Sequence, residues 1–506
     1  MAKVTRRTFL SATGAIPFAV WLERNGLAQP ANPRVRYDAR SPQGIQMLEI
    51  YASAVGKMKD ANQIPEGDPR SWTFQWYTHF VSGSTTKNAE IQRVYPNGNE
   101  PNRAVAQAMW NTCQAHIPGE TEDFFVPWHR CFVFYFEQII AAVSGRPEFT
   151  LPYWNYSTSD PSTRGVIPPQ FTLQNDPTFG PLFDGLRNPG VNQGQPIQGN
   201  DDSLLSLDSL DQTTYSPDPQ QGTPGFNMGL DNGLHGNVHV LVGGGQNMGS
   251  VPFAARDPIF WMHHCNIDRL WASWNVAGNP NPPLSQQFTF ADGQGQAVVA
   301  NIADFLDLSK LNYTYDRFEP IPGAAPLAPA AVAAARVAAP ARVAARVAQG
   351  AVALGATATQ VKLNLTAPSP AFAAASVGGR VASVRPGGRV YLIARQLKAK
   401  AQPGVVYQLY LDLPPNPTPQ QKIDRYVGAI NFFGSANHGD AHGGAPVHGE
   451  AAPFPDKFVS YDITGKARAL AASGALASEP VLTIIPRGQP DAAAEPVIGQ
   501  IELLVH

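Results

Sequence analysis

The stretch RDPIFWMHHCNIDRLWASW, residues Arg256 to Trp274, decides how the first part of this chain folds. Asp257 and Pro258 are a helix-start signal, because an aspartate side chain caps free backbone N–H groups and proline already has a helical φ angle. Apolar residues then recur at helical spacing, so the expected helix has a face to bury. The same helix carries two adjacent histidines, His263 and His264, which make it a candidate for a functional site.

These two histidines cannot both bind one metal ion, because successive residues on a helix point about 100° apart. Asp268 lies one turn beyond His264 on the same side of the helix, where a carboxylate can orient a metal-binding histidine. We expect one histidine to be a ligand and the other to pack beside it, and the spacing leaves open which is which. A hydrogen-bonded histidine pair in a protein core is the alternative interpretation. The choice between it and a metal site depends on the other histidines in the sequence.

The composition sets the broad class of the protein. A length of 506 residues exceeds one ordinary domain, and a hydrophobic content of 43% suffices for a large core, so we expect two or three domains. The formal net charge of −2 gives no electrostatic reason for nucleic acid or an anionic membrane as the main partner. The three cysteines allow one disulfide at most, which excludes a disulfide scaffold.

The N-terminus has the pattern of a targeting segment. Residues 5–10 read TRRTFL, an apolar stretch follows to about Trp21, and Leu27-Ala28-Gln29 offers a small residue for cleavage. This pattern predicts a twin-arginine signal peptide over residues 1–29, with a chance basic start before a short helix as the alternative. We therefore expect the twin-arginine machinery to export the protein to the periplasm or the medium. The rest of the chain has no apolar run of about 18 residues, so no membrane association of the mature form is expected.

A second histidine cluster, His235-Gly236-Asn237-Val238-His239, has histidines at positions i and i+4. This spacing places both imidazoles on one helical face about one turn apart, as two ligands of one metal ion require. The pattern is close to HExxH, but Gly236 stands where a zinc protease has its glutamate base. A zinc hydrolase would lack its catalyst here, so we do not expect that reaction.

Six histidines form two triplets, one before and one after a loop-rich region between residues 152 and 234. An all-histidine set without bridging carboxylates or thiolates favours copper over a two-zinc or di-iron site. Three ligands on each ion leave positions open for a small molecule, and two copper ions can together give two electrons to O₂. The first triplet is His79, His116 and His129, and the second is His235, His239 and His264.

A long apolar helix is expected from Phe124 to about Val143, and its first turns contain the tripeptide Trp128-His129-Arg130. Arg130 and Glu137 are seven residues apart on one face of this helix, so they can pair. This tripeptide with Glu137, the HGNVH segment and the DPIFWMHHCNIDRLWASW stretch together resemble the type-3 copper proteins. These are the tyrosinases, catechol oxidases and molluscan haemocyanins, and the resemblance covers roughly residues 37–320.

The resemblance implies a mainly α catalytic domain, with a dicopper site inside a four-helix bundle and long loops around it. It assigns His79, His116 and His129 to copper A, and His235, His239 and His264 to copper B. In that family the second histidine of the adjacent pair is the ligand, which selects His264.

One part of the chain departs from the family pattern. His116 and His129 are further apart than is usual, because of an insert around residues 117–123. Some relatives link a cysteine near the second copper A histidine to its ring through a thioether. Cys113, three residues before His116, is therefore either such a partner or a plain buried thiol.

The stretch NMGSVPFAARDP, residues 247–258, is similar to plant polyphenol oxidases in particular. The position of Val251 there holds a bulky aromatic gate over copper A, so valine leaves more room for a phenol. Asp231 matches a position where plant relatives have a glutamate that orders a water molecule, and it could instead cap the helix. Gly236 offers no side chain to that water, which the resemblance implies would weaken phenol deprotonation. Whether monophenols are hydroxylated therefore stays open.

The composition changes after the dicopper domain, which we place at residues 30–319. Residues 320–359 are rich in alanine, proline and arginine and are expected to form a protease-accessible linker. Alternating apolar runs between turn residues predict an all-β sandwich over residues 360–506. Within it, YVGAINFFG at residues 426–434 resembles the C-terminal domain of plant polyphenol oxidases, which covers the copper site until it is cut away. The loop histidines at 438, 442 and 448 either collect copper or, as we prefer, lie in a solvated loop.

The function that these motifs favour is copper-dependent oxidation of small phenols with O₂ as co-substrate. It comprises o-hydroxylation of monophenols, oxidation of o-diphenols to o-quinones, or both, in a chain that is latent until its C-terminal domain is removed. A haemocyanin-like O₂ carrier is the alternative, because it uses the same six histidines. A catechol assay separates the two, since a carrier forms no quinone.

Overall fold

The computed structural model describes residues 33–111, 124–218, 221–321, 350–363, 388–435 and 457–505, residue 379, and the backbone of strands 16–17 and 345–349. The expected signal peptide apart from Ile16–Pro17, Cys113, His116, most of the expected linker and the histidines at 438, 442 and 448 lie outside the described residues. The chain divides into two compact units. The first comprises Met1–Gly199, Val242–Ala325 and His438–Ala452, and the second Asn200–Leu241, Pro326–Asn437 and Pro453–His506.

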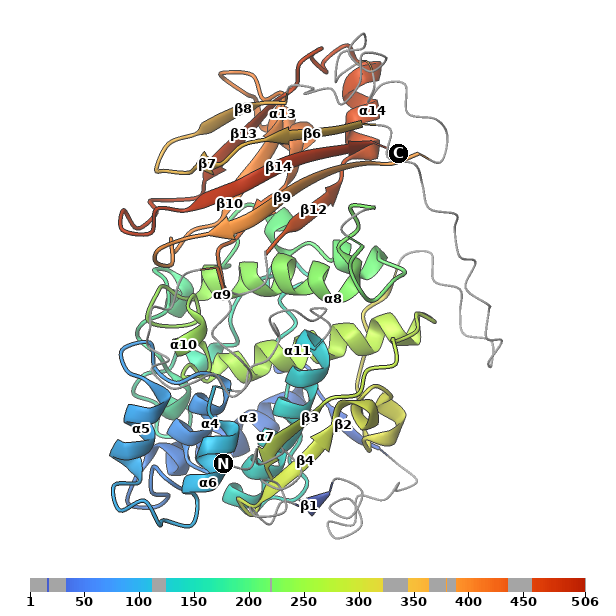
Figure 1. The fold of residues 1–506 in the computed structure, drawn as a ribbon. Coiled ribbons are helices and arrows are strands. Elements are labelled where there is room, and N and C mark those ends of the chain that lie inside the picture. The colour runs from blue at the N-terminus through green and yellow to red at the C-terminus, as the bar shows by residue number, and fades with distance from the viewer. Residues whose placement is uncertain are drawn as a thin grey trace, which may run out of the picture. The chain divides into compact units, whose positions relative to one another are not determined.

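Two long helices dominate the first unit, and they pack against each other (Figure 1). Helix α11 (Ile259–Val276) begins where the sequence predicted, with the Asp257 carboxylate accepting a hydrogen bond of 3.1 Å from the backbone N–H of Ile259. Every residue of α11 from Ile259 to Trp274 is buried, so this helix is enclosed all round rather than on one face. Helix α7 (Phe125–Ser144) ends at Gly145, whose left-handed φ of 71° suits glycine at a helix end.

The rest of the first unit surrounds these two helices. Helix α3 packs on α7, and Ser41 caps its first turn by accepting from the N–H of Gly44. The other helices are α3 (Pro42–Lys59), α4 (Trp72–His79), α5 (Lys87–Val94), α6 (Arg103–Met109) and α10 (Val251–Ala254). The short helical turns are η1 (Pro169–Phe171), η2 (Gly180–Leu182), η3 (Val191–Gln193), η7 (Ile302–Phe305) and η8 (Leu308–Lys310). The strands are β1 (Ile16–Pro17), β2 (Arg34–Arg36), β3 (Gln287–Ala291), β4 (Ala297–Asn301) and β5 (Tyr313–Tyr315), in sheets of order β1-β4-β3 and β2-β5.

The second unit contains two β-sheets around one hydrophobic core (Figure 1). One sheet has the strand order β11-β10-β13-β8 and the other the order β12-β9-β14-β6, with β7 also on β14. Leu409 and Leu482 of the first sheet share the core with Leu392 and Ile498 of the second, so the expected C-terminal β fold is confirmed. The strands are β6 (Ala345–Gln349), β7 (Val352–Ala353), β8 (Thr359–Lys362), β9 (Val390–Lys398), β10 (Tyr407–Leu411), β11 (Tyr426–Ile430), β12 (Val459–Asp462), β13 (Val481–Pro486) and β14 (Val497–Val505).

Two features of the second unit differ from the sequence expectation. Strands β6 and β7 fall inside residues 320–359, which we expected to be linker, and both pair with β14. In the loop-rich region before residue 234, the helices η4 (Asp202–Leu205), η5 (Asp208–Asp211), α8 (Gly225–Leu230) and the start of η6 (Asp231–His235) belong to this unit. They are followed by α9 (Gly236–Val242) and, later in the chain, by α13 (Pro419–Arg425) and α14 (Thr464–Ala472).

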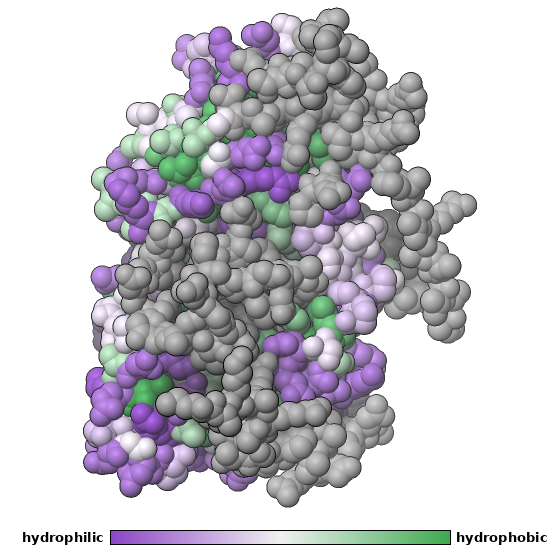
Figure 2. All heavy atoms as spheres, viewed as in Figure 1, coloured by the Kyte–Doolittle hydropathy of each residue, from purple (hydrophilic) through white to green (hydrophobic). Residues whose placement is uncertain are grey.

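The surface drawn in Figure 2 is mainly hydrophilic over the described residues, with apolar atoms in small separate patches. Among the described residues, the large hydrophobic side chains that are exposed are Leu173, Leu186, Val276 and Ile423. No described helix combines the length and the apolar character that a membrane span requires.

Candidate metal centre

Three of the candidate histidines gather in the first unit. His79 is the last residue of α4, His129 lies near the start of α7, and His264 lies within α11. The ring centroids of His129 and His264 are 4.2 Å apart, and the His79 ring lies 5.8 Å and 6.4 Å from them. All three side chains are buried, so the helix packing of this unit converges on a cluster of imidazoles.

The two adjacent histidines of α11 have different neighbours, although their ring centroids are 5.0 Å apart. His264 lies beside His79 and His129, whereas the ring of His263 lies 5.5 Å from that of Tyr156. Both are fully buried, which fits one histidine in the cluster and one packed beside it. His116 lies outside the described residues.

Aromatic rings form the wall of this cluster. Phe260 lies 4.9 Å from the ring of His79 and 4.2 Å from that of His264, and Phe132 stacks nearly parallel to His79 at 6.3 Å. Phe260 was not among the expected site residues, although its position one helical turn before His264 predicts that it lies on the same face of α11. Such rings keep water away and lower the local dielectric around a bound metal.

The other two candidate histidines lie in the second unit. His235 and His239 are one turn apart with ring centroids 4.5 Å from each other, and both are buried. The chain kinks just before them at Gly233, whose φ of −95° and ψ of −108° are not helical. The kink lies inside η6, after the end of α8 at Leu230, and the HGNVH segment runs from the last residue of η6 into α9.

The hydrogen bonds of two histidines fit metal binding. Nδ1 of His129 lies 2.8 Å from the backbone oxygen of Phe125, and Nδ1 of His235 lies 3.2 Å from that of Asp231. A carbonyl oxygen only accepts, so each Nδ1 donates, and in the neutral imidazole Nε2 then keeps its lone pair. Neutral imidazole nitrogens oriented in this way suit copper, and the donor set therefore fits the two ions that the family resemblance implies.

Asp231 lies directly against His235, with a carboxylate oxygen 2.9 Å from Nδ1. Burial lowers the pKa of His235, although the hydrogen bond and the charge of Asp231 act in the opposite direction. We expected Asp231 to order a water molecule or to cap a helix. The structure places its carboxylate on the imidazole itself.

An aromatic side chain from the C-terminal part of the chain covers His239. The ring of Phe433 lies parallel to that of His239, with centroids 4.0 Å apart and planes at 11°, and it lies 5.5 Å from the ring of His235. Phe433 belongs to the YVGAINFFG segment and is itself buried. The sequence placed this segment in the C-terminal domain but did not identify which side chain would meet a histidine.

The expected contact of Asp268 with a histidine is replaced by a buried charge network. Its carboxylate binds Arg130 of α7 and, through Oδ2, accepts hydrogen bonds of 2.6 Å from each of Tyr313 and Tyr315 of β5 and 3.1 Å from Arg36 of β2. Asp268 therefore joins three elements to α11 rather than holding His264 directly. Burial opposes ionisation, but Arg130 and Arg36 outweigh it and hold the pKa of Asp268 below its ordinary value.

The pair of Arg130 and Glu137 that the sequence spacing allows does not form. Glu137 instead accepts from Nε of Arg36 at 2.8 Å, from Arg34 and from the backbone N–H of Leu151 at 2.7 Å. Burial opposes its ionisation too, and Arg36 and Arg34 keep the pKa of Glu137 below its ordinary value. Both carboxylates of the network are thus ionised and matched by arginines.

Val251 is the first residue of α10 and is buried. The next residue, Pro252, accepts a hydrogen bond of 2.7 Å from Nε1 of Trp76, three residues before His79 on α4. This contact fixes α10 beside the helix that ends in His79.

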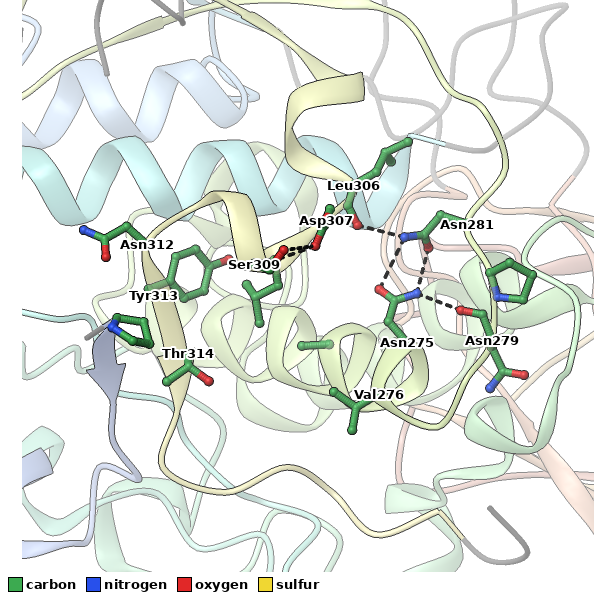
Figure 3. A pocket seen from close by; sticks show the side chains of 14 residues that line it. Asn275, Val276, Asn279, Asn281, Leu306, Asp307, Ser309, Asn312, Tyr313 and Thr314 are labelled. Carbon is green, nitrogen blue, oxygen red and sulfur yellow. Dashed lines mark hydrogen bonds between the residues drawn. The ribbon is translucent and has the colours of Figure 1, made fainter. Parts of the chain in front are cut away.

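The pocket in Figure 3, with a volume of about 730 Å³, lies elsewhere in the first unit. It is lined by the end of α11 and by residues of the η8 and β5 segments, including Asn275, Asn281 and Tyr313. No histidine lines it, so it is not the metal centre.

Comparison with known proteins identifies the two parts of the chain. Residues 69–277 match the common central domain of tyrosinase, and this range contains all six candidate histidines. Residues 343–505 match a domain of unknown function, DUF7868.

Sequence relatives come from bacteria and plants. Tyrosinase HcTyr1 of Hahella sp. (strain CCB-MM4) is 29% identical over 420 residues, which cover 77% of this chain and 83% of the relative. Polyphenol oxidase A1 of Vicia faba is 29% identical over 311 residues, which cover 55% of this chain and 46% of the relative. Catechol oxidase B of Solanum tuberosum is 31% identical over 227 residues, or 38% of this chain and 37% of the relative. The chain thus spans half or less of these plant relatives.

Solved structures extend the likeness of fold to nearly the whole chain. Recombinant latent aurone synthase, a polyphenol oxidase, has a TM-score of 0.58 at 18% identity, covering 94% of this chain and 90% of that one. Latent apple tyrosinase has a TM-score of 0.56 at 19% identity, covering 95% and 98%.

Proposed function

We propose that this chain, whose residues 69–277 match the common central domain of tyrosinase, oxidises phenols with O₂ at a pair of copper ions. The observation that carries the proposal is that the tyrosinase domain at 69–277 contains both histidine triplets. The clustering of buried His79, His129 and His264 supports it. Two copper ions held together supply electrons to O₂ and act as Lewis acids towards a phenol.

We assign the ligands residue by residue from the family pattern. His79, His116 and His129 would hold one copper ion, and His235, His239 and His264 the other. The Nδ1 hydrogen bonds of His129 and His235 support this, because they orient each ring and leave Nε2 for the metal. Asp231 would fix the His235 ring, and the Asp268 network would hold α7 and α11 in register, so that His129 and His264 keep their relative positions.

The core reaction that we propose is oxidation of o-diphenols to o-quinones. Hydroxylation of monophenols is a second activity, for which two positions give opposite indications. A valine at position 251 leaves space for a substrate ring, whereas Gly236 supplies no side chain to assist phenol deprotonation. The rate on a monophenol relative to its catechol measures which effect prevails.

We also propose that the full chain is latent and exported. Phe433 lies on the ring of His239, where it excludes a planar substrate from that imidazole. Cleavage in the expected linker, residues 320–359, followed by separation of the C-terminal part, should remove Phe433 and raise activity. The twin-arginine pattern at residues 5–10 supports export before cleavage.

Copper-loaded protein, cut and uncut, should be assayed side by side with a monophenol and its catechol. Quinone formation from catechol that disappears after chelation of copper is the expected result. Reversible O₂ binding without quinone would favour the haemocyanin-like carrier instead. Stoichiometric zinc without copper in the purified protein would overturn the copper assignment.

A further inference from the structure

Gly236 lies against a side chain that comes from far along the sequence. A Cβ atom built on Gly236 would lie 2.7 Å from Nδ2 and 2.8 Å from Cγ of Asn431, closer than real Cβ atoms approach such groups. Asn431 is fully buried and its amide is hydrogen-bonded to Asn232 and Asn237, so it cannot withdraw without losing these bonds. Position 236 must therefore be glycine as long as Asn431 occupies this place.

The Asn431 amide is fixed there by hydrogen bonds to the kinked segment. Its Nδ2 donates to the backbone oxygen of Asn232 at 2.8 Å and to Oδ1 of Asn237 at 3.0 Å. The kink at Gly233 interrupts the helical hydrogen bonding here, and Asn431 supplies a donor to a carbonyl at the break. Asn431 thus supports the turn of helix that begins at His235.

The same amide holds the loop that carries Phe433. Oδ1 of Asn431 accepts from the N–H of Phe433 at 3.3 Å and from Nζ of Lys457 at 3.0 Å. Lys457 also donates to the backbone oxygen of Phe433 at 2.6 Å. The Asn431 amide therefore connects the position of the Phe433 ring on His239 to the glycine at position 236.

We propose that Gly236 leaves the space in which the Asn431 amide packs, and that the residue at position 236 determines whether Phe433 can stay on His239. This inference rests on the proposed function, because it concerns access to the same histidines. Any side chain at 236 displaces the amide, and the loop then loses the bonds that hold it. The loop that carries Phe433 can therefore dock on His239 only while position 236 has no side chain. This requirement is separate from any effect of Gly236 on substrate deprotonation.

The test compares Gly236→Ala with Gly229→Ala in the full-length chain. Gly229 lies in α8, where a Cβ would make only ordinary contacts of 3.5–3.7 Å with Pro224 and Ser209. Both changes replace a helical glycine by alanine, so their effects on helix propensity match. The difference between them reports the contact with Asn431.

Hydrogen exchange in the copper-free protein gives a readout that does not depend on activity. Amides of residues 431–435 should exchange faster in Gly236→Ala than in the wild type or in Gly229→Ala. The β13 segment, residues 481–486, should be unchanged in all three, which excludes general unfolding. Equal exchange of residues 431–435 in the three proteins would overturn the proposal, whether or not the protein oxidises phenols.

Activity in the full chain supplies the second readout. Gly236→Ala should raise quinone formation from catechol at least about fivefold, because overpacking of this kind shifts a docking equilibrium by such a factor. In an Asn431→Ala background, Gly236→Ala should have no further effect, since the clashing amide is gone. An equal effect of Gly236→Ala in both backgrounds would show that the substitution acts on the helix itself, and it would contradict the proposed contact between position 236 and Asn431. Absence of quinone from every variant, cut or uncut, would instead count against the proposed function.

Discussion

The ring of Phe433 lies parallel to the imidazole of His239, 4.0 Å away between centroids. Both rings are buried, and Phe433 comes from the segment that follows β11 in the C-terminal sheet. A flat aromatic ring on a candidate copper ligand occupies space that a phenol would need. This one contact therefore connects the fold of the C-terminal part of the chain to the activity that we propose.

Replacement of Phe433 by alanine should activate the full-length chain without cleavage. The stacked ring is worth about 0.5–1.5 kcal/mol beyond its burial, and its loss opens the face of His239. The rate of quinone formation from catechol should rise, and KM should fall. Phe433→Tyr keeps the ring and is the matched control, so a tyrosine variant as active as the alanine variant would contradict this account.

The local elements near the metal centre could be predicted from the sequence. The helix through His263 and His264 was expected from an Asp-Pro start and helical spacing, and α11 begins two residues after Asp257. The C-terminal sheets were expected from alternating apolar runs, which is the period of a strand. Phe433 could not be assigned in this way, because stacking on His239 depends on how the loop after β11 docks.

The pairing of Arg130 with Glu137 does not form for a geometric reason. Residues seven apart share a helix face, but they are separated by about 10 Å along the axis, whereas side chains three or four apart can meet. The real partners of Glu137 are Arg34 and Arg36 of β2, two residues apart on one face of a strand. Sequence spacing within α7 carries no information about a strand from the start of the domain.

Asp268→Asn should strongly destabilise the first unit. It removes the charge that Arg130 and Arg36 face in a fully buried setting, at an expected cost of about 3–5 kcal/mol. Urea unfolding of the copper-free protein measures the change. Glu148→Ala breaks the exposed pair with Arg146 and serves as the control, which should unfold at the wild-type urea concentration. Equal effects of the two substitutions would show that the network adds no stability.

Acid should weaken this network in a defined direction. Burial disfavours the charged forms of Asp268 and Glu137, but the arginines prevail and hold both pKa values below their ordinary range. Carboxyl groups with a depressed folded-state pKa stabilise the fold above about pH 4, the pKa of the unfolded groups, and this stability is lost as the pH falls further. The urea midpoint should therefore decline below about pH 4, and less steeply in Asp268→Asn. A wild-type midpoint that does not change down to pH 3 would contradict this.

Substitutions of the adjacent histidines should separate their roles. His264 lies 4.2 Å from the ring of His129, whereas His263 lies beside Tyr156, so His264→Gln should lower bound copper and His263→Gln should not. Copper retained after desalting, measured by elemental analysis, should fall by about half in the His264 variant, because one ion of a two-metal site loses a ligand. Copper binds only the folded state, so the rise in melting temperature that it causes should also shrink in that variant alone. The two variants remove neighbouring side chains of one type that are buried to the same extent, and each is thus the control for the other. Loss of copper from His263→Gln with retention in His264→Gln would reverse the assignment of the ligand.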